Sequence, residues 1–131
     1  MQRSNPRTVH PPLGGYSHTI RVTAGTDLVF IAGQVGVDQG GSVLHGVRAQ
    51  TRQALANLRA CLEAEGLSMK HIARLTVYLT DARYIEDMRI ERQAAFGAED
   101  LPTSTLLIVS GLARPDCLVE IDAIATASAL S

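Results

Sequence analysis

The most constraining feature of the sequence is the two-residue period of residues 118–125, near the C-terminus, where Val119, Ile121, Ala123 and Ala125 alternate with Glu120 and Asp122. A β-strand projects successive side chains to opposite faces, so this period of two predicts that one face packs on a core. The other face then carries two carboxylates, Glu120 and Asp122. Residues 104–109 form a second apolar strand, joined to the first by a turn-rich link. We expect the chain to be organised around this pair of strands.

Two other segments have the helical spacing of three and four residues between apolar positions. One runs through residues 47–65 and is followed by Gly66 as a C-cap. The other begins after the capping side chains of Thr80 and Asp81 and ends near Phe96. The remaining strands are predicted at residues 19–23, 28–32 and 72–79, the first two as a hairpin.

The resulting order, β-β-α-β-α-β-β, predicts an α+β fold. The two helices are long enough to cover one face of a mostly antiparallel sheet. Outward residues such as Tyr78 and Ile124 would then have no partner within the chain. This uncovered face predicts that the protein forms oligomers.

Length and charge limit the number of domains and the classes of partner. A chain of 131 residues with 46% hydrophobic residues suits one domain, 1–131, with 1–15 as an extended N-terminal segment. Its 12 basic and 13 acidic residues give a formal net charge of -1, without the charge block that nucleic acid or anionic lipid would require. No apolar run has the length of a signal peptide or membrane span. We expect a cytoplasmic protein that binds small molecules or other protein chains.

No pattern in the sequence predicts a metal site or a cofactor. Cys61 and Cys117 are interpreted as packing residues, with a disulfide between them as the open alternative. The four histidines are scattered without metal-ligand spacing. No phosphate-binding glycine loop occurs, so no nucleotide cofactor is implied.

Four segments, in order, carry a resemblance to a known family. Residues 14–17 resemble a Gly-Pro-Tyr-Ser segment, and residues 30–34 a Ser-Gly-Gln signature. Residues 50–58 are similar to a Gln-Thr-x-Gln-x-Leu-x-Asn-Leu helix, and residues 119–125 read VEIDAIA. Together they resemble the Rid family, also called the YjgF family.

The resemblance implies a chorismate-mutase-like fold that assembles as a homotrimer, with ligand pockets between neighbouring subunits. Family members with known activity hydrolyse reactive imines and enamines to ketones and ammonia. In the deaminase branch, an arginine two residues after the proline of the penultimate strand holds the substrate carboxylate. Counted from Pro102, that position is Ser104 here, and a hydroxyl cannot replace a guanidinium. Leu106 stands where the family usually has cysteine, and Arg89 where it usually has asparagine.

Three positions of the family's pocket are retained, and each also has a purely structural interpretation. Glu120 would position or activate water as a general base, or else it faces solvent or pairs with an arginine. Gly33 would let a ligand approach the backbone, or else it kinks a strand end. Tyr16 would line the pocket, or else it caps one end of a sheet.

Arg89 has two interpretations of its own. It borders the buried stripe of its helix together with Arg92, so it would supply from the helix the positive charge that Ser104 lacks. Alternatively, it pairs with Glu86, three residues earlier, on a solvated face.

The leading interpretation is a homotrimer that binds a small carboxylate or carbonyl metabolite in intersubunit pockets. Its chemistry would be hydrolytic deamination of an imine or enamine, or a related hydrolysis, but not of the arginine-dependent 2-iminoacid type. The alternative is a noncatalytic small-molecule-binding or interaction trimer. The expected catalytic residue is Glu120, and the expected ligand-binding residues are Tyr16, Gly33, Arg89, Ser104 and Leu106.

Overall fold

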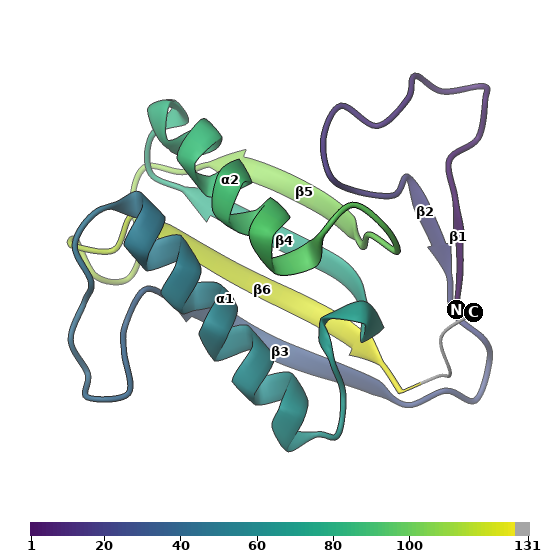
Figure 1. The fold of residues 1–131 in the computed structure, drawn as a ribbon, viewed down its shortest axis with the longest axis horizontal. Helices are drawn as coiled ribbons and strands as arrows, with labels where there is room; N and C mark the ends of the chain where they lie inside the picture. Colours follow the sequence, from purple (N-terminus) through teal and green to yellow (C-terminus); the bar gives the residue numbers. More distant parts are fainter. Residues whose placement is uncertain (128–131) are drawn as a thin grey trace.

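A four-stranded sheet carries both helices on one face (Figure 1). This computed structural model describes residues 1–127; residues 128–131, the end of the expected domain, lie outside the described residues. The elements of this layered body are β3 (Leu28–Val35), α1 (Val47–Ala64), β4 (Ile72–Leu79), α2 (Ile85–Phe96), β5 (Thr103–Ile108) and β6 (Val119–Thr126). Two short 3-10 turns, η1 (Met69–His71) and η2 (Ala82–Tyr84), precede β4 and α2.

The strand order is β3-β6-β4-β5, so the C-terminal strand lies in the interior of the sheet. β6 runs antiparallel to both of its neighbours, whereas β4 and β5 are parallel. A parallel pair needs a crossover connection, and α2 supplies it between β4 and β5. The expected α+β fold with a mostly antiparallel sheet is therefore confirmed.

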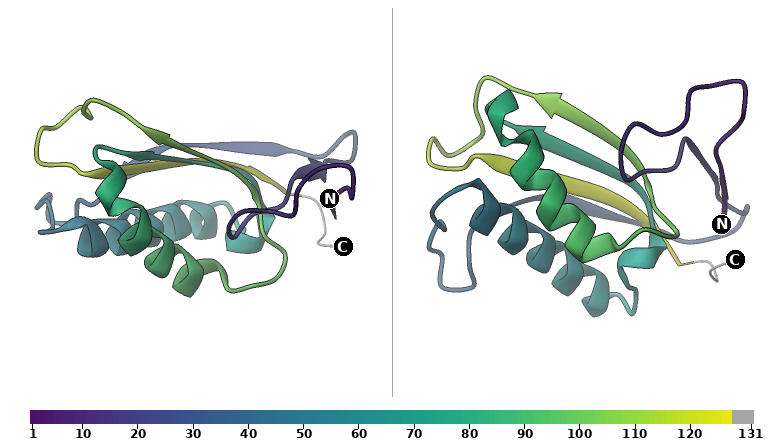
Figure 2. Two further views of the ribbon diagram at one scale, coloured as in Figure 1. Left: turned by 90° about the horizontal axis from the view of Figure 1, so that it is seen from above. Right: turned by 45° about the horizontal axis from the view of Figure 1, so that its top comes forward.

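The alternation of β6 separates the buried face of the sheet from its open face. Val119, Ile121, Ala123 and Ala125 are all at most 2% exposed. Figure 2 (left) shows both helices on one side of the sheet, and that side is where the core lies. Leu58 of α1 is fully buried there, which contributes about 2 kcal/mol of hydrophobic stabilisation. No helix of residues 1–127 lies on the opposite face of the sheet.

The helix ends follow the local sequence closely. Gly66 adopts the left-handed conformation expected of a C-cap, with a φ of 73°. The N–H of Leu67 then donates to the Leu62 carbonyl oxygen, 2.8 Å away. Asp81 accepts from the Arg83 backbone N–H, so it caps the turn that leads into α2. Among the described residues, no helix has the length and hydropathy to cross a membrane.

The prediction of a hairpin between residues 19–23 and 28–32 was wrong. β2 (Thr19–Arg21) pairs instead with β1 (Gln2–Ser4), in a separate two-stranded sheet, while β3 pairs with β6. Alternation predicts which face of a strand is buried, but it does not select the partner strand. β3 and β6 have eight residues each and can pair along their length, whereas β2 has three. The N-terminal segment thus contains a strand that we had not expected.

A buried carboxylate joins the two helices. Glu91 of α2 is 7% exposed and accepts hydrogen bonds from Arg48 and Arg52 of α1, at 3.0 Å and 2.9 Å. The hydrogen bond from Arg52 is the main cause that lowers the pKa of Glu91, against the opposing effect of burial. A carboxyl group with a lowered pKa in the folded state stabilises that state above its ordinary pKa, and the stabilisation disappears as the pH falls.

We therefore expect E91Q to make thermal stability less dependent on pH in the acid range. From about pH 7 down to about pH 3, the unfolding midpoint of the wild type should fall more steeply than that of E91Q. Asp81 also has a lowered pKa, of about 2, chiefly because of its side-chain hydrogen bonds with Arg83, but it is present in both proteins. Calorimetric midpoints across this range test the prediction, and parallel curves would contradict it.

Candidate functional site

The residues expected in a binding site form two groups, and the first lies where α2 faces the start of β5. Ser104 is the second residue of β5, and its side chain is on the helix-covered side of the sheet. Leu106, two residues later, lies on the same side and packs against the core. The loop that carries Tyr16 approaches this end of β5, because the N–H of Ser17 donates to the Pro102 carbonyl oxygen at 2.8 Å.

Arg92 is the residue of α2 that reaches Ser104. Its Nη1 donates to the Oγ of Ser104, 3.1 Å away, and its Nη2 donates to the carbonyl oxygen of Gly15, 2.7 Å away. The residue is only 9% exposed because it follows the buried Met88 by one helical turn. Burial is the main cause that lowers the pKa of Arg92, and the positive charge of nearby Arg89 is the second cause. Neither hydrogen-bond partner of this buried guanidinium carries a charge.

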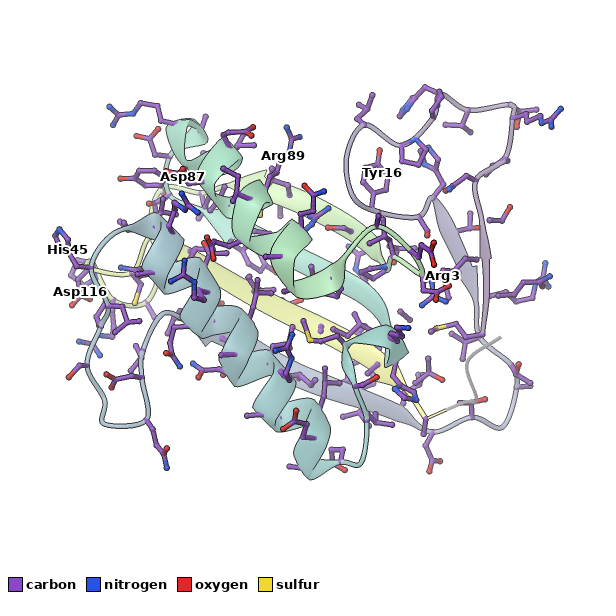
Figure 3. The ribbon with its side chains drawn as sticks, viewed as in Figure 1. Arg3, Tyr16, His45, Asp87, Arg89 and Asp116 are labelled. Carbon is purple, nitrogen blue, oxygen red and sulfur yellow. The ribbon has the colours of Figure 1, made fainter. Side chains whose placement is uncertain are left out.

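A pocket of about 360 Å³ lies between α2 and the N-terminal loop, which is residues 5–18 between β1 and β2. Arg89 and Arg92 both line it, together with Gly14 and Gly15 from the loop. Figure 3 shows Arg89 on α2 and Tyr16 in the loop toward the same edge of the molecule. Glu86 also lines the pocket, but it forms no ion pair with Arg89 among the described residues. The pocket thus contains two cationic side chains without a carboxylate partner.

Tyr16 makes its contacts within the loop. Its hydroxyl accepts a hydrogen bond from the N–H of Leu13 at 3.1 Å, and its ring packs edge-on against His18. The Oγ of Ser17 donates to the Leu101 carbonyl oxygen at 2.7 Å, which holds the loop at the entrance of β5. Within this chain, Tyr16 therefore stabilises the loop that forms one wall of the pocket.

The second group, Gly33 and Glu120, lies on the open face of the sheet. The register of β3 against β6 shifts between Ile31 and Gln34, so Gly33 sits in a bulge. A Cβ atom on Gly33 would collide with the carboxylate of Glu120, so glycine is what lets this side chain lie over the strand. The half-buried Glu120 forms no hydrogen bond or ion pair within the described part of the chain.

The second carboxylate on this face, Asp122, is occupied by a neighbour. The hydroxyl of Tyr78 donates to Asp122 at 2.9 Å. This hydrogen bond is the main cause that raises the pKa of Tyr78, with smaller contributions from burial and from the charges of Asp122 and Glu120. Of the two carboxylates, Asp122 therefore has a hydrogen-bond donor among the described residues and Glu120 has none.

The two groups cannot form one site within a single chain. Ser104 of β5 pairs with Leu75 of β4, whereas Glu120 of β6 pairs with Tyr78, three residues further along β4. This places them about 10 Å apart along the strands and about 10 Å apart across two strand spacings. Their side chains also point to opposite faces of the sheet. A site containing both groups requires a second copy of the chain.

The described residues contain no group of three or more metal-ligating side chains. His10 and His18, eight positions apart in sequence, do come together in the N-terminal loop, with ring centroids 5.2 Å apart. Cys61 is half-buried, Cys117 is buried, and the two are not linked by a disulfide. The disulfide between Cys61 and Cys117, which the sequence left as an alternative, is therefore not formed in the structure.

The comparison with known families gives a match over most of the chain. The family model described as Endoribonuclease L-PSP matches residues 7–127, a range that contains both groups of site residues. The chain belongs to the Rid (YjgF) family. A RutC family protein of Pyrococcus horikoshii is 40% identical over 116 residues, which cover 87% of this chain and 88% of that protein.

Two further relatives show the range of proteins in the Rid family that resemble this chain. The 2-iminobutanoate/2-iminopropanoate deaminase of Salmonella typhimurium is 35% identical over 101 residues, covering 75% of this chain and 78% of that enzyme. The crystal structure of YyfB, a Rid protein of unknown function from Yersinia pestis, superposes with a TM-score of 0.86 at 30% identity. It covers 95% of this chain and 97% of that one. The chorismate-mutase-like fold implied by the sequence resemblance is thus confirmed.

Arg92 is the residue that sequence reasoning left out of the site. The sequence placed Arg89 and Arg92 beside the same buried stripe, and the hypothesis of a relocated positive charge named only Arg89. The structure brings the guanidinium of Arg92 to Ser104, while Arg89 lines the more exposed part of the pocket. The signal was present in the spacing, because Arg92 follows Met88 by one turn and must therefore lie closer to the core.

Proposed function

We propose that this Rid protein is a homotrimer that binds a small carboxylate or carbonyl metabolite between subunits. We propose further that it hydrolyses the imine or enamine form of that metabolite. The observation that carries the proposal is the separation of the two groups of site residues. Arg92 and Ser104 lie at the β5 edge, and Glu120 lies on the open face. Each group is one half of a site that a neighbouring subunit completes.

The open face of the sheet has the composition of a surface that a second copy covers. Phe30 is 72% exposed and Leu107 is 45% exposed, and both belong to strands of the main sheet. Ile124 pairs with Phe30 across two neighbouring strands, so these two apolar side chains lie side by side on this face. Exposed apolar patches of this kind mark interaction surfaces. This supports self-association through the face that carries Glu120.

Glu120 suits the role of general base in the proposed hydrolysis. Its carboxylate would accept a proton from a water molecule as the water oxygen attacks the carbon of the C=N bond. The nitrogen takes up a proton, the C–N bond then breaks, and ammonia leaves as the carbonyl group of the ketone forms. The overall reaction converts one imine and one water into one ketone and one ammonia. The deaminase name of the Salmonella relative supports this reaction class.

We expect the wild-type protein to release ammonia from freshly generated imines of several amino acids faster than buffer does. E120Q should reduce this gain by about a hundredfold or more, because it removes the general base. D122N is the matched control, since Asp122 lies on the same face but is already hydrogen-bonded to Tyr78. Coupled spectrophotometric detection of ammonia gives both rates. An E120Q rate equal to that of the wild type would show that Glu120 is not the general base.

The second candidate function is a noncatalytic trimer that binds a metabolite. The observation that favours it is Ser104, because the strand position that carries an arginine in the family's deaminase branch has only a hydroxyl here. A saturable calorimetric signal with a metabolite, together with no ammonia release from any imine, would support this alternative and exclude the hydrolase.

A further inference from the structure

The pocket between α2 and the N-terminal loop contains a buried cation without a counterion. Arg92 is nine-tenths buried, and its two hydrogen bonds go to neutral oxygens of Ser104 and Gly15. A guanidinium has five N–H donors, and the remaining ones have no acceptor among the described residues. Burying a charge without a paired charge is costly, so such a group is expected where an anion binds.

A second arginine strengthens the positive field of the same pocket. Arg89 lies one turn away on the face of α2 that the N-terminal loop approaches, with its Nε 4.0 Å from the position of a Cβ on Gly14. It forms no ion pair or hydrogen bond among the described residues, although Glu86 lines the same pocket. By contrast, Arg48 and Arg52 on α1 are both paired with Glu91. The two arginines that line this pocket, Arg89 and Arg92, thus form no ion pair among the described residues, unlike Arg48 and Arg52.

We propose that Arg92, assisted by Arg89, binds the carboxylate of the metabolite in this pocket. The planar guanidinium offers the fork geometry that a carboxylate accepts in a bidentate pair. The inference rests on the proposed function for the reaction. It departs from the expectation based on Ser104, because the positive charge that position 104 lacks is supplied by Arg92. The arginine comes from α2 rather than from β5, with Ser104 holding it in place.

A purely structural role for Arg92 makes a different prediction. Arg92 connects the loop at Gly15 to β5 at Ser104, so its loss would loosen the pocket wall. Loosening weakens the binding of charged and neutral ligands alike, whereas the loss of a carboxylate-binding group weakens only the binding of the carboxylate. The ratio of the two affinities therefore separates the roles.

The experiment is isothermal calorimetry of the assembled protein with 2-oxobutanoate and with its neutral amide, 2-oxobutanamide. We expect the wild type to prefer the carboxylate by about tenfold to a hundredfold, the usual contribution of a hydrogen bond to a charged group. R92Q should abolish the preference. R59Q is the matched control, because it removes an exposed arginine of α1 that does not line this pocket, and it should keep the preference.

A second variant moves the guanidinium instead of removing it. Nη1 of Arg92 is 3.1 Å from the Oγ of Ser104, so an arginine at 104 reaches the same volume once residue 92 is shortened. R92Q/S104R should therefore regain the carboxylate preference that R92Q loses. A wild type without any preference, or an R92Q variant that retains it, would overturn the proposal. Where R92Q alone fails to fold, a wild type without the carboxylate preference, or a folded R92Q/S104R variant without it, still overturns the proposal.

The outcomes also separate this inference from the proposed function. Ammonia release that survives R92Q with unchanged carboxylate preference would refute the role of Arg92 and leave the hydrolase standing. A carboxylate preference that depends on Arg92, without ammonia release from any imine, would refute the hydrolase and leave the binding site standing.

Discussion

A one-to-one mixture of E120Q and R92Q subunits, unfolded and refolded together, is expected to recover activity that neither variant has alone. In a trimer with sites between neighbours, each site takes Arg92 from one subunit and Glu120 from the next. Random assembly then gives about a quarter of the sites two intact halves. The mixture should therefore show about a quarter of the wild-type rate of ammonia release, measured at equal total protein concentration.

The geometry behind this expectation is the arrangement of the two groups on one sheet. Glu120 lies over Gly33 on the open face, and Arg92 is held on the helix-covered side against Ser104. No rotation of a side chain within one chain brings these groups together, because the sheet itself lies between them. Subunit exchange is the direct way to test a site of this kind.

The matched control is a refolded preparation of the double variant E120Q/R92Q, in which every site lacks both groups and no activity should return. Refolding each single variant by itself controls for gains caused by the procedure. A mixture that stays at the level of the single variants would contradict the intersubunit site, provided that mass spectrometry detects mixed trimers.

Gly36→Ala is expected to cause the largest loss of stability among single-methyl additions to this chain. Gly36 is buried directly after β3, and a Cβ atom there would run into the backbone and Cβ of Gln50 in α1. Helix backbone cannot rotate away as a flexible side chain can, so the whole helix must shift. Overpacking of this kind should cost about 3 kcal/mol or more of the free energy of unfolding.

The shift of α1 would also disturb a buried hydrogen-bond network. The side chain of Gln50 donates to the carbonyl oxygens of Leu44 and Asp116 and accepts from the N–H of Leu118. These contacts connect the loop before α1 to the link before β6. A buried polar group that loses its partner costs about 1–3 kcal/mol, which would add to the packing strain.

Urea denaturation followed by circular dichroism measures this loss. Gly111→Ala is the matched control, because a Cβ on Gly111 meets nothing within 4 Å. Its free energy of unfolding should stay within about 0.5 kcal/mol of the wild-type value. A Gly36→Ala variant as stable as Gly111→Ala would show that the contact between β3 and α1 is looser than the structure indicates.

Features that depend on a few neighbouring residues could be predicted from the sequence, whereas features that depend on distant residues could not. The alternation of β6, the apolar stripe of α1 and the glycine cap at Gly66 could all be read from neighbouring residues, and the structure confirms them. Each depends on a repeat or a cap within a few residues of chain. The family resemblance extended this local information to the whole fold, because its segments occur in a fixed order.

Two features required the tertiary structure. β2 pairs with β1 rather than β3, because the choice of partner strand depends on the packing of the whole sheet. Similarly, the sequence determined that Ser104 is not an arginine and that two arginines border the buried stripe of α2. Only the folded chain decided that Arg92 reaches Ser104, because the crossover through α2 places residues twelve positions apart within hydrogen-bonding distance.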